Sequence, residues 1–135
     1  MNTRVEPLVA CSRWAFGRPV EPAVAASALR EWLAGIASGC ASPGGHVMGH
    51  IKAYAALPAG GCIRGNATST RQAPDVELHE PAAATLAALE ITLNVLVVGL
   101  GPEAVRGQAI RALDAVAARY GFTHSTSAAQ SQGEY

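Results

Sequence analysis

The sequence predicts one α+β domain in which two helices cover one face of an antiparallel sheet. Segments 22–38 and 102–120 repeat apolar residues every three or four positions, as amphipathic helices do. Segments 46–57, 61–71 and 90–99 alternate polar and apolar residues, which is typical of strands buried on one face only. Two such helices and such a sheet bury their apolar sides most simply as a two-layer sandwich.

The first helix is expected to begin at Glu21 and Pro22. Proline suits the first helical turn, and an acidic side chain suits the positive end of the helix dipole. Gly39 is expected to end this helix near residue 38, after an apolar stripe that includes Trp32.

The segment before this helix, residues 4–20, is less regular. A short strand around Leu8 and Cys11 is expected only at a sheet edge, because Pro7 cannot donate a hydrogen bond to a neighbouring strand. Residues 17–19 combine glycine and proline and predict a break.

A hairpin accounts for the middle of the chain, with strands at 46–57 and 61–71. Residues 72–80 are polar and predict a loop with a short extended piece at 76–78. The segment 90–99 concentrates β-branched residues, which favours a strand.

The second helix follows a glycine-rich turn at 99–101 and is expected to end at Tyr120. A last short strand is expected at 122–126. The sheet then has four or five strands, the single domain covers residues 1–127, and residues 128–135 are expected to form a disordered tail.

This order of elements resembles two known folds. Two helices packed on one face of such a sheet resemble the ferredoxin-like α+β sandwich. The run of helix, three strands and helix resembles the double-stranded-RNA-binding fold. Both resemblances rest on topology and imply no activity or site residue.

Charge and cysteine content limit the function classes. Ten basic and ten acidic residues among 135 give a net charge of +0, so no global field attracts nucleic acid or an anionic membrane. No apolar run approaches the ~20 residues of a membrane span, and the first residues lack the order of a signal peptide. Cys11, Cys40 and Cys62 form no CxxC motif and are odd in number, which favours free thiols in the cytoplasm.

Alanine dominates the apolar composition, with 28 alanines against 36 larger apolar residues. Alanine contributes little buried area per side chain. Such a core is expected to gain further burial between subunits, so the sequence predicts a homo-oligomer.

The polar face of the predicted sheet is the candidate binding site. Strand parity places on it His46, His50, Lys52, Arg64, Asn66, Thr68, Glu90, Thr92 and Asn94. The expected ligand residues are Lys52, Arg64, Asn66, Thr68 and Thr92. Their donors on neighbouring strands suit a small anion such as a carboxylate or phosphate, bound on this face or where subunits meet.

Lys52 is the only lysine in the chain. A lysine serves as a point contact for an anion or as an amine whose pKa shifts readily. If the protein is an enzyme, His50 or Lys52 is therefore the candidate acid–base catalyst.

Three other interpretations of the polar face remain open. The face is a plain solvated surface in the first interpretation. In the second, it is the binding surface of a non-catalytic module that binds another protein. In the third, it belongs to a metal-binding domain whose ligands are His50, Glu90 and His124. His46 and His50 alone stand roughly 13 Å apart on a regular strand. That separation is too large for one ion with ~2.1 Å bonds to nitrogen.

No motif identifies a cofactor. Gly99 to Ala104 fits the pattern G-x-G-x-x-A between a strand and a helix. Only about 30 residues follow it, and no acidic residue lies ~20 positions further on, as a dinucleotide site requires. A glycine turn before a helix explains the pattern, and any cofactor stays unknown.

Overall fold

The structure, a computed structural model, describes residues 6–41 and 46–128, without the side chains of residues 46–48. Its elements are β1 (Leu8–Val20), α1 (Pro22–Cys40), β2 (His46–Ala56), β3 (Cys62–Ser69), β4 (Asp75–His79), β5 (Leu86–Val97), α2 (Pro102–Tyr120) and β6 (Phe122–Ala128). All these strands belong to one antiparallel sheet in the order β4-β3-β2-β5-β1-β6. The expected α+β class is confirmed.

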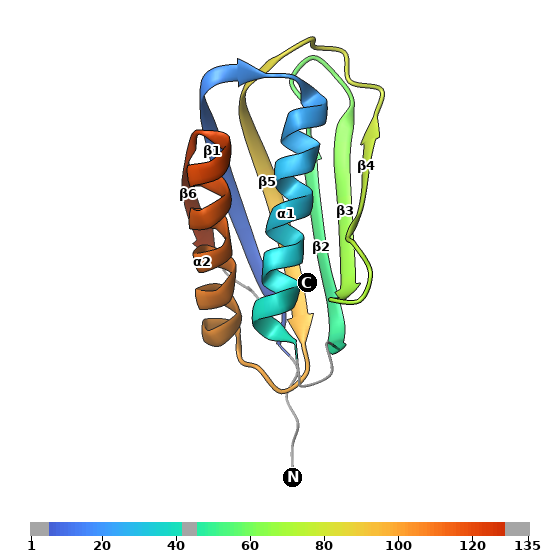
Figure 1. The fold of residues 1–135 in the computed structure, drawn as a ribbon, viewed down its shortest axis with the longest axis vertical. Coiled ribbons are helices and arrows are strands. Elements are labelled where there is room, and N and C mark those ends of the chain that lie inside the picture. The colour runs from blue at the N-terminus through green and yellow to red at the C-terminus, as the bar shows by residue number, and fades with distance from the viewer. Residues whose placement is uncertain (1–5, 42–45, 129–135) are drawn as a thin grey trace, which may run out of the picture.

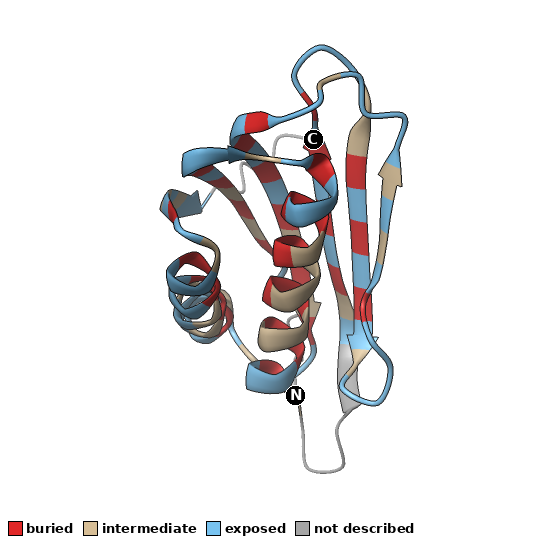
Figure 2. Ribbon diagram, turned by 45° about the horizontal axis from the view of Figure 1, so that its top comes forward, coloured by how far each residue is buried: buried red, intermediate tan, exposed pale blue. Residues whose placement is uncertain are grey.

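Both helices lie on the same face of the sheet (Figure 1). α1 packs across β2, β3 and β4, whereas α2 packs beside β1 and β6 and against α1. Buried and exposed residues alternate along the strands (Figure 2), as expected for a sheet covered on one side. The core therefore lies between the sheet and the two helices.

β1 differs most from the expectation. It is 13 residues long and lies between β5 and β6, whereas the sequence predicts a short edge strand. Pro7 precedes Leu8, the first paired residue, so its missing N–H removes no hydrogen bond from the sheet. The predicted break at 17–19 is an irregularity in the pairing between Ala15 and Val20, and β1 continues through it.

The sheet within the described ranges has six strands rather than four or five, and four strands rather than three separate the helices. The additional strand is β4, which extends the predicted piece at 76–78 and forms a sheet edge. β5 begins at Leu86, before the expected residue 90, and β6 continues to Ala128, past the predicted domain boundary. The rest of the predicted tail, 129–135, lies outside the described residues.

α1 continues past Gly39, the predicted helix end, to Cys40. A Cβ atom at Gly39 would collide with the side chain of Gln108 on α2. Gly39 therefore faces α2 in the last turn of α1, and the helix ends one residue after it. Trp32 adds a hydrogen bond between the helices, from its Nε1 to the carbonyl oxygen of Ala109 at 2.9 Å.

Aromatic rings from β1, α1 and β6 fill one end of the core. Trp14 stacks on Phe122 with ring centroids 4.2 Å apart and lies 5.8 Å from Trp32. Phe16 meets both Trp14 and Phe122 edge-on. Since Trp14 and Trp32 are almost completely buried, these rings join the first strand, the first helix and the last strand.

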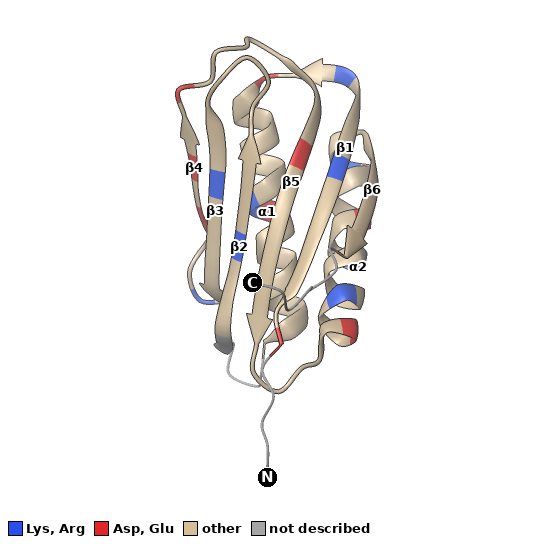
Figure 3. Ribbon diagram, turned by 180° about the vertical axis from the view of Figure 1, so that it is seen from behind, with Lys and Arg blue, Asp and Glu red and all other residues tan. Residues whose placement is uncertain are grey.

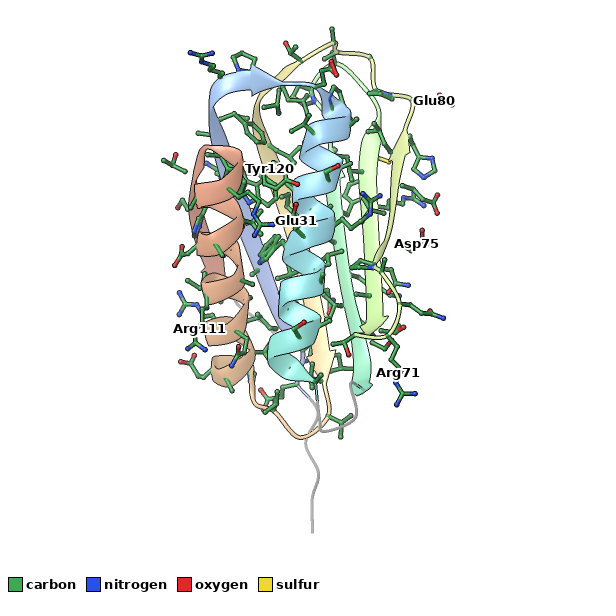
Figure 4. The ribbon with its side chains drawn as sticks, viewed as in Figure 1. Glu31, Arg71, Asp75, Glu80, Arg111 and Tyr120 are labelled. Atoms are coloured by element: carbon green, nitrogen blue, oxygen red, sulfur yellow. The ribbon has the colours of Figure 1, made fainter. Side chains whose placement is uncertain are left out.

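Polar contacts at the surface join the end of α2 to the middle of α1. Glu31 on α1 accepts hydrogen bonds from the Tyr120 hydroxyl and from Arg119, both on α2 (Figure 4). The hydrogen bond to Glu31 raises the pKa of Tyr120, and partial burial adds to the rise. These contacts fix the last turn of α2 against α1.

Cys11, Cys40 and Cys62 are all free thiols. Cys40 is buried, and burial raises the pKa of its thiol, whereas the other two cysteines are partly exposed. Among the described residues, neither helix has the length and apolar character needed to cross a membrane.

Candidate functional site

The face of the sheet that the helices leave uncovered carries two rows of polar side chains across β4, β3, β2 and β5. The first row is Asp75, Asn66, Lys52 and Asn94, and the second is Glu77, Arg64, Tyr54 and Thr92. We call the surface made by these two rows the open face. Neighbouring strands lie ~4.8 Å apart and the rows about 6.6 Å apart. The open face therefore has the extent of a small molecule.

Strand parity places Ile51, Ile63, Leu93, Lys52 and Arg64 on the predicted sides of the sheet, whereas the side chain of His46, also predicted for the polar face, lies outside the described part of the structure. Ile51, Ile63 and Leu93 are fully buried beneath the helices, whereas Lys52 and Arg64 are exposed on the open face. The alternation follows from the period of two in an extended chain.

The open face is hollowed into a shallow pocket of about 500 Å³. Its lining includes Ala53 and Gly65, which are paired across β2 and β3 between the two polar rows. A Cβ atom at Gly65 would lie 2.5 Å from Cδ1 of Leu33 on the helix side. Glycine here lets α1 approach β3 closely and leaves the pocket on the opposite side.

Four of the five predicted ligand residues line this pocket, namely Lys52, Arg64, Asn66 and Thr92. Thr68 is exposed on β3, two positions beyond Asn66, and does not line the pocket. The structure thus brings most of the predicted set together and leaves Thr68 at its side.

Lys52 and Arg64 provide the positive charge of the pocket. They are diagonal neighbours on β2 and β3, because Lys52 pairs with Asn66 and Arg64 pairs with Tyr54. Diagonal neighbours lie about 7–8 Å apart, within reach of long side chains. Neither forms an ion pair with another described residue, and Figure 3 shows both positive segments near the middle of the sheet.

β4 adds two carboxylates that were absent from the predicted site. Asp75 is paired with Asn66, and Glu77 is paired with Arg64. Glu77 also lies 3.0 Å from Nε2 of His79. The signal in the sequence was the alternation of charged and apolar residues at 75–79, which is a complete strand pattern although it is short.

Asn94 supplies an unused hydrogen-bond acceptor beside Lys52. Its Oδ1 atom is buried and has no hydrogen-bond partner among the described residues. A buried acceptor without a partner costs about 1–3 kcal/mol. The torsion that turns an asparagine amide is broad, so the group can rotate toward a ligand in the pocket.

The two catalytic candidates do not occupy the pocket together. Lys52 lines the pocket. His50 lies two residues before Lys52 on β2 and is paired with Leu96, whereas Lys52 is paired with Asn94. His50 therefore borders the pocket.

The three residues considered for a metal site do not converge. His124 lies on the helix side of β6, with Nε2 2.7 Å from Oδ1 of Asp114 on α2. Glu90 lies on the other side of the sheet, where Nε of Arg13 donates to it at 2.7 Å. The sheet separates these two groups, so one ion cannot contact both. Among the described residues, no cluster of three His, Cys, Asp or Glu suits a metal.

A chain of hydrogen bonds on the helix side joins β1, β6 and α2. Nε1 of Trp14 donates to Oγ of Ser12 (3.0 Å), which lies 2.8 Å from Oγ1 of Thr126. Thr126 lies 3.2 Å from Nδ1 of His124, which reaches Asp114 through its other nitrogen. The sequence pattern did not predict this chain of hydrogen bonds, because its members come together only when β6 pairs with β1. Ser12 is fully buried, so the chain anchors β6.

No family model, curated protein or solved structure matches this chain.

Proposed function

We propose that the open face binds a small anionic molecule, with Lys52 and Arg64 as its main contacts. The observation that carries this proposal is the pair of diagonal cations in one pocket, neither of which forms an ion pair with another described residue although Asp75 and Glu77 line the same pocket. Charge-assisted hydrogen bonds to an anion contribute about 1.5–3 kcal/mol each. Two of them together contribute about 3–6 kcal/mol before the cost of association and screening by solvent are subtracted.

Neutral side chains on either side of the cations support the same proposal. Asn66 is paired with Lys52, and Thr92 lies one strand beyond Tyr54 in the row of Arg64. An amide and a hydroxyl at these positions orient a ligand that the cations hold. Lys52 is also the group best placed for acid–base chemistry, because it alone of the two candidates lines the pocket.

Removing either cation is expected to weaken anion binding about tenfold or more, since one charge-assisted hydrogen bond is lost. The measurement is a titration of Lys52→Ala and Arg64→Ala with a panel of carboxylates and phosphates, followed by amide chemical shifts. Both residues are exposed, so neither variant is expected to lose stability.

Arg106→Ala is the matched control, because it removes one positive charge from an exposed position on α2, far from the open face. Equal loss of binding in all three variants would show that net charge, and not the pocket, attracts anions. Unchanged binding in both pocket variants would refute the anion site.

Self-association is part of the same proposal, and the outer edge of β6 supports it. β6 is the last strand of the sheet and carries no Lys, Arg, Asp or Glu, whereas the opposite edge strand, β4, alternates charged side chains. Edge charges discourage pairing between sheets, and uncharged edges permit it. Two copies paired through β6 would form a symmetric dimer.

Light scattering at micromolar concentration is therefore expected to give a mass above 13.8 kDa. Ser125→Lys places a charge on β6 and is expected to shift the protein toward the monomer. Ala87→Lys, at an exposed position on β5, is the control and is expected to leave the mass unchanged. A wild-type monomer at every concentration would contradict the proposal.

A ferredoxin-like topology and a cytoplasmic location complete the proposal. The strand order β6-β1-β5-β2, with α1 after β1 and α2 after β5, supports a ferredoxin-like arrangement extended by β3 and β4. The free thiols of Cys11, Cys40 and Cys62 support a reducing compartment.

A further inference from the structure

Tyr54 is the exposed aromatic residue at the centre of the open face. It exposes 45% of its surface, although most large apolar side chains of the described residues are buried. Its ring makes no aromatic contact with another described residue, and its hydroxyl has no hydrogen-bond partner among them. A tyrosine in this position offers a free flat surface inside a polar pocket.

The register places this ring next to both cations. Tyr54 is directly opposite Arg64 on β3 and two positions from Lys52 on its own strand. Opposite residues lie about 5 Å apart and next-but-one residues on a strand about 6.6 Å apart, so an anionic group held between these cations lies beside the ring of Tyr54. Thr92, directly opposite Tyr54 on β5, borders the ring on the other side.

We propose that the ligand is a flat ring that bears one anionic group, with the ring stacked on Tyr54 and the anionic group held by Lys52 and Arg64. This inference rests on the proposed anion site and specifies the class of its ligand. Stacking requires a planar partner, whereas the cations require only negative charge. The two requirements are separable by experiment.

The carboxylates of β4 narrow the class further. Asp75 and Glu77 balance the charges of Lys52 and Arg64 within the same pocket. They repel a second anionic group and accept hydrogen bonds from N–H donors. The amides of Asn66 and Asn94 offer donors and acceptors in the row beside the ring. A nitrogen-containing ring with amino or ring N–H groups satisfies these neighbours better than a simple hydrocarbon ring.

Two sources supply a flat ring that bears one anionic group: aromatic carboxylates, and nucleoside monophosphates, whose bases also carry nitrogen donors and acceptors. The test uses the full chain and two matched pairs of probes, benzoate with cyclohexanecarboxylate and adenosine monophosphate with ribose 5-phosphate. Affinities are measured from amide chemical shifts at fixed ionic strength. The member with the flat ring is expected to bind about threefold or more tightly in at least one pair, since ring stacking contributes beyond area burial.

Tyr54→Leu is expected to remove this preference and leave binding of cyclohexanecarboxylate or ribose 5-phosphate unchanged. Tyr54→Phe keeps the ring and is expected to keep the preference. Because Tyr54 is exposed, both variants are expected to fold, which the dispersion of the amide spectrum reports.

The pair that shows the preference identifies the source of the ligand. Equal affinity within both pairs, with binding still dependent on Lys52, overturns the inference about the ring and leaves the anion site intact. Absence of binding by all four probes overturns both. A ring preference that persists in Tyr54→Leu also overturns the inference.

Discussion

Trp14→Ala is expected to lower the free energy of unfolding by about 3–5 kcal/mol. Trp14 exposes 1% of its surface, stacks on Phe122 and contacts Trp32. Truncation leaves a cavity between β1, α1 and β6. It also removes the hydrogen bond that Nε1 of Trp14 donates to Oγ of Ser12. A domain of this size has a total stability of about 5–15 kcal/mol, so the loss is a large fraction of the total.

Urea unfolding followed by far-ultraviolet circular dichroism measures this loss. Tyr54→Ala removes an aromatic ring from an exposed position and is the control, with an expected change within about 0.5 kcal/mol. Similar losses in the two variants would mean that the rings of β1, α1 and β6 do not form the core described above.

Val95→Asp is expected to prevent folding. Val95 is completely buried on β5, a strand paired on both sides, so the carboxylate meets neither water nor a partner cation. An unpaired buried charge costs far more than the stability of a domain of this size. The amide spectrum is expected to collapse to that of an unfolded chain.

Val98→Asp is the matched control three positions further on. Val98 exposes 41% of its surface after the end of β5, so the same substitution keeps its charge in water. This variant is expected to fold with a stability close to that of the wild type. A folded Val95→Asp protein would contradict the assignment of β5 to the centre of the sheet.

Strand parity was readable from the sequence, and strand order was not. The periods at 46–57, 61–71 and 90–99 correctly assigned Ile51, Lys52 and similar residues to opposite faces. Parity is a local property of the extended chain. Which strands become neighbours depends on contacts between distant segments, such as the pairing of β5 with both β1 and β2.

The predicted length and edge position of β1 were wrong, because they rested on local sequence features and not on contacts with distant segments. Pro7 and residues 17–19 argued for a short edge strand. They lie outside, or at an irregular part of, the paired segment, so they do not prevent a central position. The burial of Trp14 and Phe16 beneath the helices decides the position of β1, and that burial involves rings on α1 and β6.

The residues that the site takes from β2, β3 and β5 were predicted, and those that it takes from β4 were not. Lys52, Arg64, Asn66 and Thr92 lie on strands with long, clear alternation. Asp75 and Glu77 were not predicted, because they lie on β4. This strand has only five residues, and its place in the sheet is known only from its pairing with β3. Tyr54 lies two residues from Lys52, so the same parity places it on this face, but its importance depends on the position of Arg64 opposite it.

The place of β1 in the sheet also has a consequence for how the chain acquires its structure. β1 is made first during synthesis, yet its two neighbours are β5 and β6, and Ser12 meets Thr126 across 114 positions of sequence. Contacts this distant in sequence slow folding, because closing a long loop costs chain entropy before the contacts compensate for it. While β6 is still inside the ribosome, β1 has one open edge and its aromatic rings lack Phe122. Completion of the sheet therefore waits until β6 has left the ribosome, and until then the apolar residues of β1 that face β6 stay uncovered.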